Sequence, residues 1–223
     1  MLYWQQITSL GGLSFTGTIA VVIFVVMATG GRARLAIEWG LLFGAAMLAV
    51  VVTKIAFMGW GLGFREAGFA GMSGHAARAA ATFPVAFFLL FQNERARALN
   101  FGVMLGVLAA AVVAYSRIQV HAHPPSEAWT GFSAGLAAAT AFIARAAQQP
   151  PVRLRPVLIG ICLLILMVRP AQEPVDSEKW IAVAAMKLSG HDRVYQRWSW
   201  KPARRPFQVR CRPGEIAHGY RCA

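Results

Sequence analysis

Ionisable side chains stand beside apolar segments in two separate stretches of this sequence. Together these stretches hold Lys54, Arg65, Glu66, His75, Arg78, Arg117, His121, His123 and Glu127. Ionisable groups at membrane depth are energetically costly, so they usually serve a function. The cationic groups suit a phosphate, and two separated histidine segments suit a nucleophile and an acid. The pattern therefore predicts phosphoryl chemistry.

The first histidine segment predicts an anion site at the start of a helix. Ser73, Gly74 and His75 precede an alanine-rich run that favours helix. Backbone N–H groups at the positive end of that helix would point at a phosphate. Gly74 permits close approach of the chain, and His75 is positioned to protonate a leaving oxygen.

The second histidine segment predicts a nucleophile. His123 is followed by two prolines, which are tolerated in the first turn of a helix and place His123 near the N-cap. Glu127 then lies one turn further on, where its carboxylate can hold the Nδ1 proton of His123. The other ring nitrogen is thereby free to attack phosphorus. Lys54 and Arg117 would neutralise the phosphate oxygens, and this arrangement requires no metal or cofactor.

These residues resemble the signature of the type 2 phosphatidic acid phosphatase (PAP2) superfamily of integral membrane lipid phosphatases. The signature is a Lys that ends one helix, a Ser-Gly-His that opens the next, and a Ser-Arg followed after five residues by His and after three more by an acid. The chain has Lys54, then Ser73 to His75, then Ser116-Arg117 with His123 and Glu127 at the matching spacing. The resemblance spans roughly residues 54 to 140 and implies a phosphohistidine intermediate.

Two positions depart from the superfamily pattern. The first motif normally continues to an Arg-Pro seven residues after the Lys, but Gly61 stands there, so one phosphate ligand is missing. Arg65 and Arg78 are the two candidates to replace it. Glu127 stands where the superfamily usually has Asp, and its longer side chain can still orient an imidazole.

The resemblance implies hydrolysis of a lipid phosphate monoester or diphosphate. An isoprenoid diphosphate such as undecaprenyl diphosphate is the favoured substrate, while phosphatidic acid, phosphatidylglycerol phosphate and lipid A phosphates stay open. Two alternatives also stay open: a lipid phosphotransferase, and a degenerate, non-catalytic protein that binds lipid headgroups. The expected partners are the phosphorylated lipid and membrane lipids, and the sequence indicates no protein partner.

The composition predicts an all-α, polytopic membrane protein. Of the 223 residues, 57% are hydrophobic and only 14% are charged. Apolar stretches predict a bundle of about six transmembrane helices. They cover residues 13–30, 36–53, 77–92, 99–115, 128–147 and 156–168. The spans are almost bare of charge, which disfavours a transporter, and the net charge of +13 comes from residues that flank them rather than from a nucleic-acid-binding face.

The distribution of arginines predicts the orientation of the chain in the membrane. One set of helix ends carries Arg32, Arg34, Arg95, Arg97, Arg145, Arg153 and Arg155, and the positive-inside rule makes that set cytoplasmic. The chemistry would then face the periplasm or exterior of a bacterial-type inner membrane. We expect a PAP2-like domain over residues 1–170 and a basic tail over 171–223, with a short amphipathic helix at 176–188. Cys211 and Cys222 are close enough in sequence for a disulfide, which the sequence leaves open.

Overall fold

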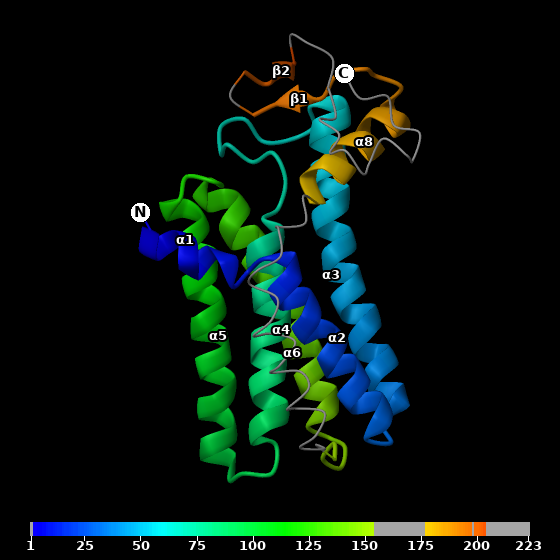
Figure 1. The fold of residues 1–223 in the computed structure, drawn as a ribbon, viewed down its shortest axis with the longest axis vertical. Coiled ribbons are helices and arrows are strands. Elements are labelled where there is room, and N and C mark those ends of the chain that lie inside the picture. The colour runs from blue at the N-terminus through cyan, green and yellow to red at the C-terminus, as the bar shows by residue number, and fades with distance from the viewer. Residues whose placement is uncertain (1, 154–176, 198, 204–223) are drawn as a thin grey trace. The chain divides into compact units, whose positions relative to one another are not determined.

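The chain is mostly helical, and a long irregular loop joins α3 to α4 (Figure 1). The structure, a computed structural model, describes residues 2–153, 177–197 and 199–203. The helices are α1 (Leu2–Ser9), α2 (Leu13–Thr29), α3 (Ala33–Trp60), α4 (Gly74–Phe91), α5 (Ala96–Gln119), α6 (Pro125–Ala146) and α8 (Ser177–Ser189). Two short strands, β1 (Tyr195–Gln196) and β2 (Lys201–Pro202), pair antiparallel. The all-α class expected from the sequence is confirmed.

Four segments of the described chain are long and apolar enough to cross a membrane. They are Tyr3–Thr29, Ala33–Trp60, Gly74–Phe91 and Ala96–Gln119. The span expected at 128–147 is also a helix, α6, but its small and polar residues lower its hydropathy and it is not among the four. The expected sixth span, at 156–168, lies outside the described residues, as do Cys162, Cys211 and Cys222. The chain has the helices of a membrane protein.

The described residues divide into two compact units. Unit 1 comprises residues 2–50 and 72–153, and unit 2 comprises 51–71, 177–197 and 199–203. The division passes through α3, which begins in unit 1 and ends in unit 2. The domain boundary expected near residue 170 lies outside the described residues.

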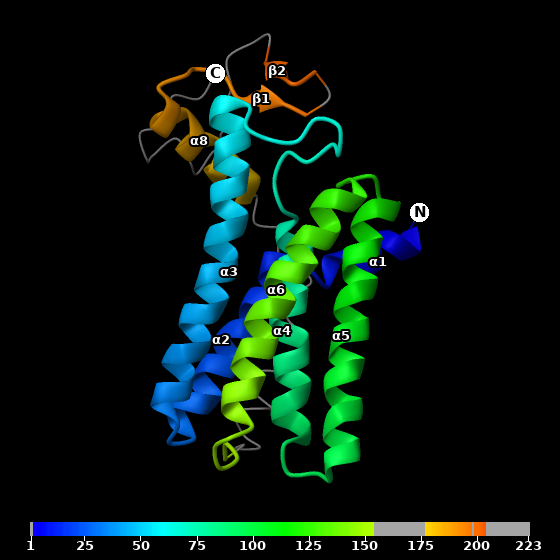
Figure 2. The same ribbon diagram turned by 180° about the vertical axis from the view of Figure 1, so that it is seen from behind.

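Helix α4 is the centre of unit 1, where it packs on α2, α5 and α6 (Figures 1 and 2). Its first half is rich in alanine, and Ala76, Ala77, Ala79, Ala80 and Ala81 are all fully buried. Small side chains let neighbouring helices approach closely, which is how helices associate in a membrane without a hydrophobic driving force. The alanine run that predicts a helix therefore also makes α4 the helix that its neighbours can surround.

Two of the helices that pack on α4, namely α5 and α6, each present a pair of glycines at four-residue spacing. On α6, a Cβ added to Gly135 would lie 2.1 Å from the carbonyl oxygen of Ala77. On α5, a Cβ added to Gly106 would lie 2.7 Å from Cα of Pro84. Their partners in the pairs, Gly131 and Gly102, are also in close contact with the α4 region. These Gly-x-x-x-Gly pairs fix how near the helices lie and hence where their ends meet.

A second contact holds the first half of α3 in unit 1. Trp39 is buried, and its indole N–H donates to the carbonyl of Ala20 on α2 at 3.2 Å. Its ring packs edge-on against Phe142 of α6, with the centroids 5.6 Å apart. A buried tryptophan needs a partner for its N–H, and this one is satisfied while its ring fills the core.

Unit 2 packs the end of α3 against α8 and the hairpin of β1 and β2. Phe57 meets Trp200 edge-on with centroids 4.9 Å apart, and His191 bonds to the carbonyl of Gly59 at 2.9 Å. Gly61 ends α3 with a positive φ of 72°. The sequence places the end of this helix near residue 53, but the apolar residues after Lys54 continue it to Trp60.

Close packing at Gly135 makes a direct prediction about stability. We expect Gly135→Ala to lower the free energy of unfolding by about 1–3 kcal/mol, because the added methyl group meets backbone atoms that cannot rotate away. Gly44→Ala on α3 is the matched control, since a Cβ there meets nothing within 4 Å. It should be neutral or stabilising by up to about 1 kcal/mol. Thermal unfolding in detergent measures both, and equal stability of the two variants would contradict the prediction.

Candidate active site

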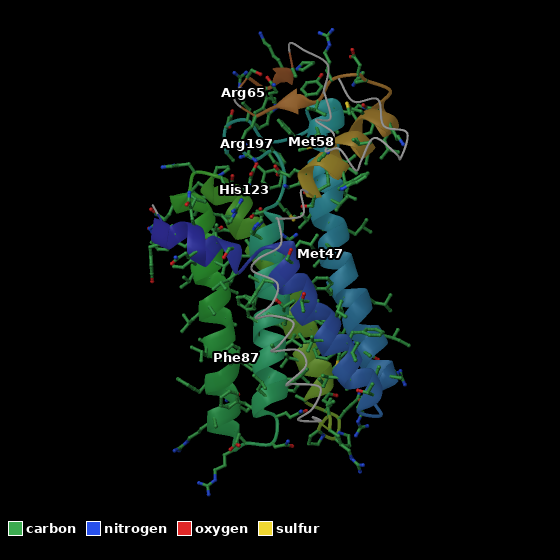
Figure 3. All side chains as sticks on the ribbon, viewed as in Figure 1. Met47, Met58, Arg65, Phe87, His123 and Arg197 are labelled. Atoms are coloured by element: carbon green, nitrogen blue, oxygen red, sulfur yellow. The ribbon has the colours of Figure 1, made fainter. Side chains whose placement is uncertain are left out.

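The residues singled out by the sequence meet at one end of unit 1. His75 lies in the first turn of α4, Arg117 in the last turn of α5, and Glu127 in the first turn of α6. His123 lies in the loop that joins α5 to α6, and Phe87 of α4 lies toward the opposite end of the unit (Figure 3). Helix ends brought together by the packing of α4 thus assemble one cluster.

A buried pair forms the core of this cluster. Nδ1 of His123 and Oε2 of Glu127 are 2.5 Å apart. The Glu127 residue is completely buried, and His123 is 7% exposed. A buried carboxylate must be paired, and here it accepts the Nδ1 proton of the imidazole. This fixes the orientation of the ring and leaves the lone pair of a neutral ring on Nε2.

The loop before His123 is closed by a tight turn. His121 has a positive φ of 54°, a conformation that histidine adopts more readily than most residues. The N–H groups of Ala122 and His123 both donate to the carbonyl of Arg117, at 3.1 and 3.2 Å. Pro124 is the N-cap of α6, and His123 directly precedes it, near the cap as the two prolines predict. His121 is exposed, and its contribution lies in the backbone.

Ser73 and Gly74 join the start of α4 to the start of α6. The N–H of Ser73 donates to the carbonyl of Glu127 at 2.9 Å. Gly131 makes this approach possible, since a Cβ there would lie 2.5 Å from the carbonyl oxygen of Ser73. The expectation that the Ser73 N–H binds phosphate is therefore wrong, because Glu127 occupies it. Among the described residues, the buried hydroxyl of Ser73, the N-cap of α4, has no hydrogen-bond partner.

Arg78 and His75 lie on successive turns of α4. Arg78 is 8% exposed, and its Nη2 lies 3.3 Å from the carbonyl oxygen of Gly11 and 3.5 Å from Nδ1 of His75. A guanidinium only donates, so Nδ1 of His75 accepts in this contact and the proton of a neutral ring is on Nε2. His75 is half-buried, with Gly11 packed against its Cβ.

The N-terminal helix contributes residues that sequence reasoning missed. The hydroxyl of Thr8 accepts a hydrogen bond from Nη1 of Arg117 at 2.8 Å, and Trp4 packs edge-on against Tyr115 of α5. The turn after α1 supplies the carbonyl of Gly11 to Arg78. No local pattern signals these contacts, because they join residues that are far apart in the sequence.

Two expected phosphate ligands belong to unit 2. Lys54 is buried, and its ammonium lies 2.5 Å from Oε1 of Glu178 on α8. Gly71 packs on the stem of Lys54 with a φ of 132°, where a side chain would collide. Arg65 is exposed in the loop after α3 (Figure 3). Their proposed roles as phosphate ligands rest on the sequence pattern.

The cluster in unit 1 has the parts needed for phosphoryl transfer. It combines an imidazole oriented for attack, a second imidazole at a helix start, and two guanidinium groups. Its carboxylate, Glu127, is already paired with His123. Within the described residues no group of three His, Cys, Asp or Glu side chains is arranged to hold a metal ion. Positive charge in this cluster favours an anionic ligand.

The His123 pair makes a prediction that spectroscopy can test. We expect ¹⁵N-histidine NMR to show the His123 proton on Nδ1, with a far-downfield proton signal from the short hydrogen bond to Glu127. Glu127→Gln removes the charge at nearly constant shape, so it should abolish that signal and move proton density to Nε2. His123→Ala assigns the signals, and His121→Asn should leave them in place. A His123 spectrum unchanged by Glu127→Gln would contradict the geometry.

Comparison with known proteins identifies the family of the chain. The family model described as PAP2 superfamily matches residues 53–151, which include the end of α3 and all of α4, α5 and α6. The chain is 38% identical, over 148 residues, to an uncharacterized 22.5 kDa protein in the cps region of Klebsiella pneumoniae. That alignment covers 66% of this chain and 71% of the relative. No solved structure matches the chain. The chain belongs to the PAP2 superfamily, whose members are generally phosphatases.

Proposed function

We propose that this protein is a membrane lipid phosphatase in which His123 carries the phosphoryl group during turnover. The observation that carries the proposal is the 2.5 Å contact between Nδ1 of His123 and the fully buried carboxylate of Glu127. A histidine held in this way has one tautomer and one orientation. Because Nε2 of this tautomer carries the lone pair, it can attack phosphorus without a separate general base.

In the first step Nε2 of His123 attacks phosphorus. The P–N bond forms, the bond between phosphorus and the leaving oxygen breaks, and His75 gives that oxygen a proton. The ring becomes positively charged on phosphorylation, and the carboxylate of Glu127 stabilises that charge. Arg117 and the N-terminal end of α4 offset the negative charge on the phosphoryl oxygens.

In the second step water attacks the phosphorus of the phosphohistidine. His75, now without its proton, takes one from the attacking water. The new P–O bond forms as the P–N bond of phosphohistidine breaks, and free phosphate leaves. His123 and His75 both return to their starting states, so one water is consumed for each phosphate released. Lys54 and Arg65 are further candidate phosphate ligands by sequence pattern.

The favoured substrate is an isoprenoid diphosphate such as undecaprenyl diphosphate, presented at the outer face of a bacterial-type inner membrane. In unit 1 the α4–α5 loop, which holds Arg95, and the end of α6, which holds Arg145, lie at the opposite end from His123 (Figures 1 and 3). Gln92 at the end of α4 and Val152 exchange two hydrogen bonds, which keeps these two ends together. By the positive-inside rule that end is cytoplasmic, and His123 then faces outward.

The test is phosphate release by purified protein in detergent from isoprenoid diphosphates and phospholipid monophosphates. We expect His123→Ala to lower kcat by on the order of 10³-fold or more, because the nucleophile is removed. His121→Asn is the matched control, since it removes a neighbouring imidazole and keeps a residue that tolerates the left-handed backbone. It should retain nearly full activity, and thermal unfolding checks that all proteins are folded.

Three outcomes would contradict the proposal. Equal phosphate release by wild type and His123→Ala would exclude His123 as the nucleophile. Transfer of the phosphoryl group to a second lipid, without free phosphate, would make the protein a phosphotransferase. Binding of lipid headgroups with no turnover of any substrate would indicate a non-catalytic member. A phosphoprotein that is acid-labile and base-stable, formed by wild type and absent from His123→Ala, is the expected result for the intermediate.

A further inference from the structure

We propose that Arg78 is a ligand of the substrate phosphate and takes the place of the first-motif arginine that is absent at Gly61. This inference rests on the proposed function, because it concerns the same site. It decides between Arg65 and Arg78, which the sequence leaves open. It also gives the N-terminal turn, which holds Arg78 through Gly11, a part in the site.

The burial of Arg78 demands an anionic partner that the described chain does not supply. Only 8% of the residue is exposed, and its Nε is buried with no hydrogen-bond partner. Its contacts are a carbonyl oxygen at 3.3 Å and a ring nitrogen at 3.5 Å, both neutral and both long. No carboxylate among the described residues pairs with it. A buried charge without a counter-charge costs several kcal/mol, so an anion would stabilise this site strongly.

The position of Arg78 is that of a phosphate ligand. A Cβ added to Gly74 would lie 3.1 Å from Nη1, so the guanidinium lies directly against the first residue of α4. The buried hydroxyl of Ser73 at the N-cap has no partner among the described residues. A helix N-terminus, a hydroxyl and a fork of guanidinium donors together offer what phosphate oxygens accept.

Arg117 is the second guanidinium group beside the proposed phosphate position. Its positive charge acts on Arg78, so two like charges stand close together in an apolar environment. Arg117 donates a hydrogen bond to the hydroxyl of Thr8, and Arg78 donates one to the carbonyl of Gly11. A phosphate dianion would relieve the repulsion and offer each guanidinium two oxygens.

The same geometry couples phosphate binding to His75. Arg78 donates to Nδ1 of His75, which keeps that nitrogen unprotonated. When Arg78 turns to a phosphate, Nδ1 becomes available for a proton, and the negative charge of the phosphate favours the protonated ring. Substrate binding thereby prepares His75 as the general acid. Arg65 is exposed in a loop of unit 2 and has no comparable environment.

The experiment measures the affinity for inorganic phosphate from the rise in Tm of the detergent-purified protein as phosphate is added. We expect Arg78→Gln to weaken phosphate binding at least tenfold. Arg78→Lys keeps the positive charge but loses the paired N–H donors of the guanidinium, so it should weaken phosphate binding severalfold. Arg145→Gln, the same change at an exposed side chain in the last turn of α6, should bind phosphate like wild type. If Arg78→Gln does not fold, Arg78→Lys decides.

Wild-type phosphate affinity in both Arg78 variants would overturn the inference, as would no phosphate-induced rise in the Tm of wild type. Loss of binding in Arg65→Gln, with binding retained in the Arg78 variants, would assign the role to Arg65. The lipid substrates separate this inference from the proposed function. Phosphate binding that depends on Arg78, without hydrolysis of any lipid, would contradict the proposed function but support Arg78 as a phosphate ligand. Hydrolysis with kcat/KM unaffected by the Arg78 substitutions would support the proposed function and overturn the role of Arg78 as a phosphate ligand.

Discussion

The arrangement of unit 1 depends on Glu127, which uses its side chain and its backbone for two different tasks. The carboxylate holds Nδ1 of His123, while the carbonyl accepts the N–H of Ser73. One residue therefore ties His123 to the first turn of α6 and the first turn of α6 to the N-cap of α4. Because the carboxylate is fully buried, it cannot exchange its partner for water without a large cost. The position of His123 relative to the start of α4 thus follows from a single buried group.

That tie is only possible because the helices approach more closely than ordinary side chains allow. Gly131 admits the backbone of Ser73, and one turn later Gly135 admits the carbonyl of Ala77. A side chain at either position would push α6 away from α4 and separate Glu127 from Ser73. Packing along the bundle and chemistry at its end are therefore linked. The Gly-x-x-x-Gly pair of α6 serves the site as much as it serves stability.

The sequence predicts the local part of this site well and the long-range part poorly. Helices follow from apolar runs, and the pairing of His123 with Glu127 follows from a spacing of one helical turn. Gly131 and Gly135 carry a readable signal in their spacing. In contrast, the contacts of Arg78 with Gly11, of Arg117 with Thr8 and of Lys54 with Glu178 cross 67, 109 and 124 residues of sequence. No periodicity encodes such contacts, because they depend on how the helices are placed around α4. The end of α3 was also missed, because nothing in its apolar run stops a helix before Gly61.

The balance of charge in unit 1 explains how such a site can handle phosphate. In many phosphoryl-transfer sites divalent cations neutralise the oxygens that carry the developing charge. Here Arg78, Arg117 and the positive end of α4 supply positive charge, and the one carboxylate of the cluster is already committed to His123. The N-terminal segment contacts the two guanidinium groups through the hydroxyl of Thr8 and the carbonyl of Gly11. Under the proposed function, a phosphate would offer both groups charge-assisted hydrogen bonds, which are stronger than bonds to neutral acceptors.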